Sequence, residues 1–235
     1  MKSSTAIKSL AAIMLCIART ASGDEPPHKR VQSESTDLTR FGPNGIIRLA
    51  NSSGSLIVEG WDRQEVQVTV LKWIDQNPDS KPLPDADQLL KGTSVTIEHP
   101  SDTEVKVSTS HPLRHVAIQY HIYAPRDSRI AVDHRGGYIL LSGLTGDIDV
   151  ASRNGDIVLM LPAQASYAID AFNKVGVIAA DMSGAIKHKH IVGEQFTLDK
   201  QPPAAHHMRL RMGFGGITIK EVPPEGEASA FVPAK

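Results

Sequence analysis

The chain has 235 residues, of which 40% are apolar, and this is enough to build one domain of good size or two small ones. Its formal net charge of −1 at pH 7 does not favour a nucleic-acid partner or an anionic membrane surface. Aromatic residues make up only 5% of the chain, which argues against a carbohydrate cleft lined with rings and against a base-stacking platform.

Residues 1–23 are typical of a secretory signal peptide. A lysine-bearing start precedes an apolar run at residues 10–18, which is too short to span a bilayer, and Ala21-Ser22-Gly23 has the small residues of a cleavage site. Cys16 is the only cysteine of the chain. Cleavage near Gly23 therefore leaves a mature chain with no thiol and no integral membrane segment, and we expect it in the periplasm, on the outer cell surface or in the medium.

After the cleavage site, residues 24–40 are polar and contain two prolines, which predicts a flexible lead-in. Order is expected from Phe41. Alternating apolar and polar residues then predict strands, and Asp85–Lys91, followed by Gly92, predicts one short helix. The proline-rich tail at 223–235 has no periodicity, so we expect it to be disordered. The predicted strands cover residues 45–49, 54–58, 65–74, 95–97, 105–107, 116–122, 129–132, 167–171, 206–212 and 216–222.

Residues 136–161 carry one short pattern three times, beginning at Gly137, Gly146 and Gly155 with a spacing of nine residues. Each glycine precedes a small alternating β unit, so each unit predicts one strand followed by one turn, with Asn154-Gly155 as a turn. Similar units begin at Gly45, Gly54, Gly184 and Gly215, with a weaker copy at Gly176.

A single unit of this kind cannot bury its own apolar face, so the copies must stack or pair. The expected fold is all-β, either solenoid-like or a repetitive sandwich, and periodicity does not choose between the two. The alternation places Ile148 and Ile157 in the core. It leaves Asp147, Asp149 and Asp156 on a solvated strand face rather than in calcium-binding turns, because the tandem Gly-Gly-x-Gly-x-Asp motif is missing.

Several segments resemble the bacterial DUF4097 family, whose members are often labelled adhesins. They are NSSGSLIVEGWD at 51–62, EVQV at 65–68, AP at 124–125, GLTGDIDV at 143–150 and NGDIVL at 154–159. The resemblance covers residues 41–222 and implies an exported, solenoid-like β domain in or on the cell envelope. It brings no catalytic motif to any position of this chain. The sequence departs from the family pattern at residues 187–190 and 202–207.

Two constellations suggest chemistry. His188 and His190 lie two residues apart on one predicted strand face, where they could bind zinc or copper. Asp147 and Asp149 share another face, as paired carboxylates do in a polysaccharide-acting enzyme. Neither pattern is specific, so the sequence assigns no catalytic, cofactor-binding or metal site. Histidines that could join the first pair are His111, His115, His206 and His207.

The sequence therefore predicts a non-enzymatic exported protein of the cell envelope. Its adhesin-like β-scaffold would present a binding surface to an unknown protein or cell-surface partner. A periplasmic metal binder and a β-helix enzyme are the alternatives. Open edges of such a scaffold can also pair, so self-association is a further expectation.

Overall fold

A computed structural model describes residues 29–76, 86–110, 113, 115–180, 182–183, 185–200 and 203–223. The predicted signal peptide, the first residues of the lead-in and nearly all of the C-terminal tail lie outside these ranges. The described part is almost entirely β, as predicted. It contains one helix, α1 (Ala86–Gly92), at the predicted position. None of its helices is long and apolar enough to cross a membrane.

Within the described residues, thirteen strands form one large sheet that does not close on itself. In chain order they are β1 (Lys29–Arg40), β2 (Ile46–Ser53), β3 (Ser55–Trp61), β4 (Glu65–Gln76), β5 (Ser94–Ser101), β6 (Glu104–Ser110), β7 (Ala117–Pro125), β8 (Arg129–Ser142), β9 (Ile148–Pro162), β10 (Tyr167–Ala180), β11 (Ile186–Lys189), β12 (Glu194–Asp199) and β13 (His206–Val222).

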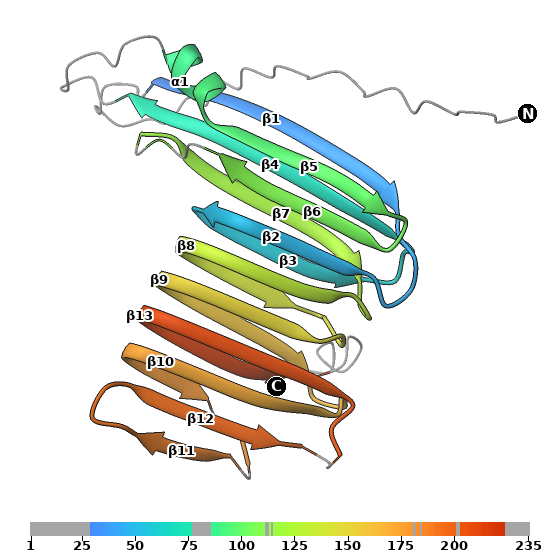
Figure 1. The fold of residues 1–235 in the computed structure, drawn as a ribbon, viewed down its shortest axis with the longest axis vertical. Helices are drawn as coiled ribbons and strands as arrows, with labels where there is room; N and C mark the ends of the chain where they lie inside the picture. The colour runs from blue at the N-terminus through green and yellow to red at the C-terminus, as the bar shows by residue number, and fades with distance from the viewer. Residues whose placement is uncertain are drawn as a thin grey trace, which may run out of the picture.

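The sheet folds back on itself because its long strands bend in the middle. The first half of β8 pairs with β2, from Ile46 opposite Arg129 onward, whereas its second half pairs with β3, from Leu56 opposite Ile139 onward. The strands β9, β13 and β10 follow in the same parallel register across both halves. Figure 1 shows the second halves lying behind the first, so that two layers face each other.

A ladder of glycines forms the bend. Gly54, Gly137, Gly155, Gly215 and Gly176 all have φ between 106° and 136°, a region that L side chains rarely adopt. Adjacent strands also approach closely here, because a Cβ on Gly155 would lie 1.9 Å from the carbonyl oxygen of Gly137. Only glycine satisfies both conditions.

The ladder corrects the predicted turn at Asn154-Gly155, which lies inside β9. Two nine-residue units join into one bent strand, so the structural repeat is the 18 residues from Gly137 to Gly155. Gly146, the glycine between them, is not part of the ladder. It packs against the backbone carbonyl oxygens of Asp127 and Ser128.

The core lies between the two layers. Ile148 and Ile157, on the two halves of β9, are 1% and 0% exposed, which confirms the predicted strand faces. Val66, Val68 and Val70 of β4 are buried in the same way. Each inward side chain alternates with an outward one, as the period of two requires.

Two further features differ from the prediction. Residues 29–40 form β1, which pairs with β4 throughout, instead of a flexible lead-in. Its exposed polar side chains at 32–36 show why alternation did not reveal it, since backbone pairing at the sheet edge holds the strand. The two predicted strands at 206–212 and 216–222 are one strand, β13. It lies between β9 and β10, although it follows both in the chain.

Candidate binding groove at the bend of the sheet

Buried polar side chains support the bend from inside. Oγ of Ser52 lies 2.8 Å from Nδ1 of His134, whose Nε2 lies 3.2 Å from the carbonyl oxygen of Gly54. Because that carbonyl can only accept, Nε2 carries the hydrogen and Nδ1 accepts from Ser52. Burial lowers the pKa of His134, which favours the neutral ring. Asn173 similarly donates its amide to the carbonyl oxygen of Gly215 at 2.7 Å.

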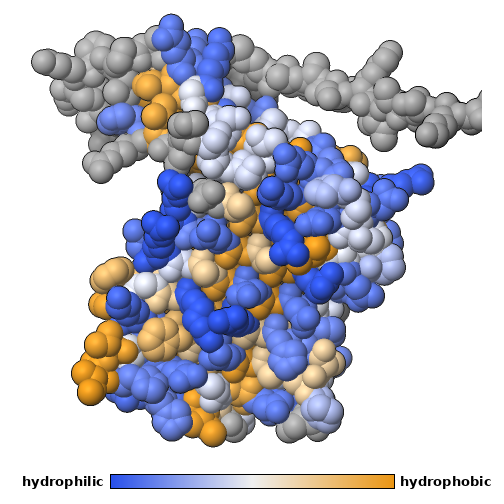
Figure 2. All heavy atoms as spheres, viewed as in Figure 1, coloured by the Kyte–Doolittle hydropathy of each residue, from blue (hydrophilic) through white to orange (hydrophobic). Residues whose placement is uncertain are grey.

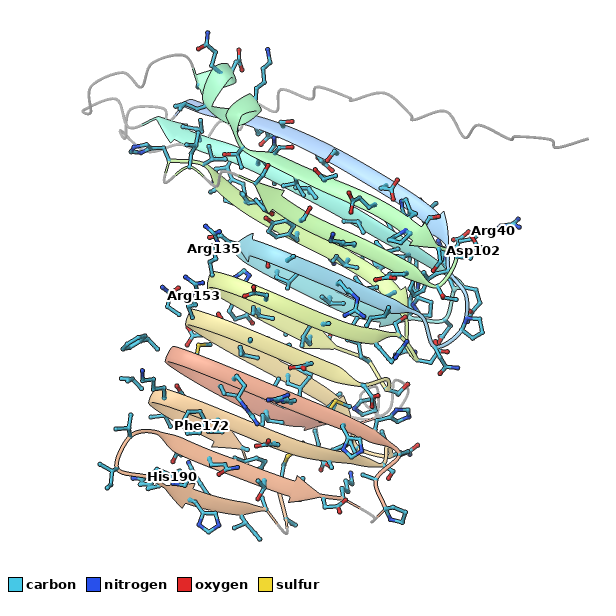
Figure 3. The ribbon with its side chains drawn as sticks, in the orientation of Figure 1. Arg40, Asp102, Arg135, Arg153, Phe172 and His190 are labelled. Carbon is cyan, nitrogen blue, oxygen red and sulfur yellow. The ribbon has the colours of Figure 1, made fainter. Side chains whose placement is uncertain are left out.

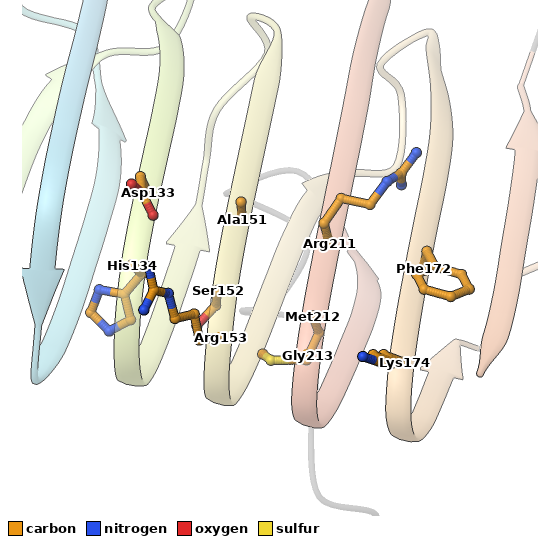
Figure 4. Close-up of a pocket in the computed structure, with 10 residues that line it drawn as sticks. All are labelled: Asp133, His134, Ala151, Ser152, Arg153, Phe172, Lys174, Arg211, Met212 and Gly213. Atoms are coloured by element: carbon orange, nitrogen blue, oxygen red, sulfur yellow. The ribbon is translucent and has the colours of Figure 1, made fainter. Parts of the chain in front are cut away.

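On the outer face of the front layer, next to the bend, a shallow groove crosses β8, β9, β13 and β10 (Figure 4). Its volume is about 360 Å³. The small residues Ala151 and Gly213 leave space between longer side chains, which come from alternate outward positions of the strands. The lining residues are Asp133, His134, Ala151, Ser152, Arg153, Phe172, Lys174, Arg211, Met212 and Gly213.

Two of the three cations in this groove have no carboxylate partner. Arg211 donates to the side chain and the main-chain carbonyl of Asp170, and these contacts hold the pKa of that carboxyl below its usual value. Arg153 and Lys174 make no ion pair within the ranges that the structure describes. Both side chains are exposed, so they are available to an anionic group.

The two cations follow the repeat of the glycine ladder. Arg153 lies two residues before Gly155, and Lys174 lies two residues before Gly176. Gly213 has the corresponding position on β13, between them. This spacing is a sequence signal that would have found the groove once the glycines were recognised as one bend rather than as separate turns.

Phe172 closes the groove on the β10 side. Its ring centroid lies 6.4 Å from that of His190, in the connection between β11 and β12. Asp133 supplies a carboxylate on the opposite side. The groove thus has an acidic end, two unpaired cations and an aromatic wall, an arrangement suited to binding a polar or anionic group.

The serine and the histidine that line the groove are both engaged in hydrogen bonds. Oγ of Ser152 donates to the carbonyl oxygen of Asn154 at 3.1 Å, and both ring nitrogens of His134 are used beneath the bend. These two residues therefore support the fold. We assign no reaction to the groove.

The residues of the two alternative functions lie elsewhere. His188 is on the exposed strand β11, and Nε2 of His190 lies 3.3 Å from the side-chain oxygen of Gln195. Asp147 precedes β9 and accepts a hydrogen bond from the backbone N–H of His207 at 2.9 Å. Among the described residues, no three His, Cys, Asp or Glu side chains gather as a metal site would require. Metal binding by the histidines stays a prediction.

No protein-family model and no curated protein sequence matches this chain. The resemblance to DUF4097 therefore stays a prediction.

Solved structures that resemble the chain share little sequence with it. A suspected cell adhesion protein from Clostridium sporogenes ATCC 15579 is 13% identical with a TM-score of 0.48, over 80% of this chain and 100% of that one. A suspected adhesin from Bacteroides fragilis NCTC 9343 is 9% identical with a TM-score of 0.25, over 80% and 97%. A suspected lipid binding protein from Parabacteroides distasonis ATCC 8503 is 7% identical with a TM-score of 0.23, over 80% and 96%. These TM-scores are too low to support an argument about function.

Proposed function

We propose that this chain is a non-enzymatic, adhesin-like protein of the cell envelope, exported after cleavage near Gly23. Its sheet acts as a scaffold, and the groove at the bend binds a partner that carries an anionic group. The observation that carries this proposal is the pair of unpaired cations, Arg153 and Lys174, beside Phe172 in an open groove.

The scaffold suits such a role because its geometry is repetitive and because the bent strands β8, β9, β13 and β10 pair with one another in parallel. Each bent strand places one glycine in the ladder and one outward residue two positions earlier, so side chains on neighbouring strands project in rows. We take this stacking of bent strands to support a solenoid-like DUF4097 domain. The rows hold the binding side chains in fixed register without a flexible loop.

The groove would favour a partner with both charge and an apolar or flat portion. An exposed cation contributes modestly by itself, because water and salt screen it. Arg153 on β9 and Lys174 on β10, with β13 between them, give the groove positive charge, and the ring of Phe172 adds contact area. Binding should therefore weaken as ionic strength rises.

A cell-binding isotherm tests the proposal. Fluorescently labelled full-length protein is titrated onto intact cells and isolated envelopes of the host. We expect saturable binding that falls about tenfold or more in the Arg153→Glu/Lys174→Glu double variant, because repulsion replaces attraction at the groove. Lys220→Glu is the matched control, since Lys220 is an exposed cation on the second half of β13, behind the groove. Equal binding by the double variant and the control would overturn the proposal.

A further inference from the structure

Exposed apolar side chains gather where the bend meets the β11–β12 connection. Val175 of β10 and Phe214 of β13 are register partners at the tip of the bend, and Phe214 is 58% exposed. Val177 follows on the same strand as Val175 and is also exposed. Two further apolar residues, Ile191 and Val192, are in the connection, and Ile191 is fully exposed. We call these five residues the apolar tip.

The connection lies against the bend and is not a remote loop. A Cβ on Gly193 would come within 2.7 Å of the carbonyl oxygen of Asn173 and 2.8 Å of the Phe172 ring. Ile191 and Val192, the two residues before Gly193, are therefore close to the segment that leads into Lys174 and Val175. In Figure 2, hydrophobic side chains stand out along the lower left edge of the molecule, the side on which the strands bend.

Cations follow the same edge. Figure 3 places Arg135 and Arg153 along it, above Phe172 and His190. Lys174 lies one residue before Val175 on the same bend. A nearby carboxylate, Asp156, accepts a hydrogen bond from the backbone N–H of Gly216 at 2.9 Å, so it is engaged by the bend itself. The net charge of −1 is a sum over the whole chain, so it does not reveal the cations gathered along this edge.

We propose that this edge docks on an anionic phospholipid surface. The apolar tip enters the region between headgroups and acyl chains, and Lys174 and Arg153 contact the headgroup phosphates. Interfacial segments of proteins combine projecting apolar side chains with flanking Lys and Arg in this way, and their binding depends on both apolar area and anionic lipid.

The arrangement favours a lipid surface over a pocket ligand because the apolar side chains project outward from a convex bend. Phe214 and Ile191 extend into solvent from different segments, so no wall surrounds them. A small ligand would leave most of that area in water, whereas a lipid layer covers all of it at once. The inference shares Arg153 and Lys174 with the proposed groove, but it goes beyond the proposed function, because the apolar tip lies outside the residues that line the groove.

Vesicle flotation tests the inference with the full chain. The probes are vesicles of phosphatidylglycerol mixed with phosphatidylcholine, and vesicles of phosphatidylcholine alone. We expect binding to the anionic vesicles that weakens as salt rises and is much lower on the neutral ones. Ile191→Asp and Phe214→Asp should each lower binding about tenfold, since each removes one inserting side chain and adds a charge that the headgroups repel.

Leu38→Asp is the matched control, because Leu38 is 56% exposed on β1, at the opposite end of the sheet. Residues 1–28 are the same in all variants, so only differences between variants count. Circular dichroism checks that each variant remains folded. Binding of Ile191→Asp and Phe214→Asp that equals the control would overturn the inference, as would equal binding of the wild type to neutral and anionic vesicles.

Host-cell binding separates this inference from the proposed function. If Ile191→Asp lowers binding to cells but not to anionic vesicles, the apolar tip contacts a protein and the lipid inference is wrong. If the groove variant Arg153→Glu/Lys174→Glu binds cells as the wild type does while Ile191→Asp loses vesicle binding, the lipid inference stands and the proposed groove function fails.

Discussion

Replacing Gly155 with alanine should damage the fold more than any conservative change on the surface. Gly155 has φ 106°, and an added Cβ would lie 1.9 Å from the carbonyl oxygen of Gly137 and 2.8 Å from its nitrogen. The backbone strain alone costs about 1–3 kcal/mol. The contact must also open until the two atoms are at least 3.0 Å apart, which separates β8 from β9 in the middle of a parallel ladder.

Together these effects should cost about 3 kcal/mol or more, of a total stability of about 5–15 kcal/mol. For a domain of this size, a loss of about 3 kcal/mol lowers the melting temperature by roughly 6–12 °C. Thermal unfolding followed by circular dichroism measures the change. Gly92→Ala is the control, because a Cβ there meets only a Leu113 methyl group at 3.5 Å. A Gly155→Ala melting temperature equal to that of the control would refute the glycine ladder.

Three further predictions concern the core and the pH dependence of stability. Ile157→Asp places an unpaired charge at a fully buried position and should cost several kcal/mol, so an unchanged melting temperature would show that the strand faces are reversed. Burial lowers the pKa of His134, so the folded state binds fewer protons than the unfolded state, and the free energy of unfolding should fall as pH drops below 6.5. Urea unfolding at several pH values should show this loss in the wild type and not in His134→Gln. Hydrogen bonds from Lys200 and Tyr167 lower the pKa of Glu221, so its contribution to the free energy of unfolding is present above pH 4.5 and is lost as pH falls through the lowered pKa. Glu221→Gln should make the free energy of unfolding depend less on pH in the acid range. An unchanged pH dependence would show that Glu221 is not its source.

Local patterns predicted the parts of the fold that local physics determines. Strict alternation placed Ile148 and Ile157 in the core, because successive side chains of a strand point to opposite faces. The acidic start, Lys91 and the closing Gly92 located α1. The prediction of a turn at Asn154-Gly155 was wrong, because Asn-Gly is also a strong hairpin signal. Only the pairing of neighbouring strands shows that β9 continues through it.

Long-range pairing was beyond the reach of these patterns. β1 is held by its backbone ladder with β4 and has no apolar face to reveal it. β13 lies between β9 and β10, an order that depends on contacts between segments far apart in the chain.

The groove depends on that order, because the position of β13 separates Arg153 from Lys174 and places Gly213 between them. The spacing of each cation from its bend glycine was visible in the sequence. Only the register of β9, β13 and β10 shows that this spacing places both cations along one groove.

Fractionation of the native host is the most direct test of the proposed envelope role. Periplasm, membranes, medium and cytoplasm are separated, the protein is located in each fraction, and mass spectrometry identifies its N-terminus. We predict a chain that begins near residue 24 and is found in the envelope fractions or the medium. A full-length chain that begins at Met1 and remains in the cytoplasm would contradict it.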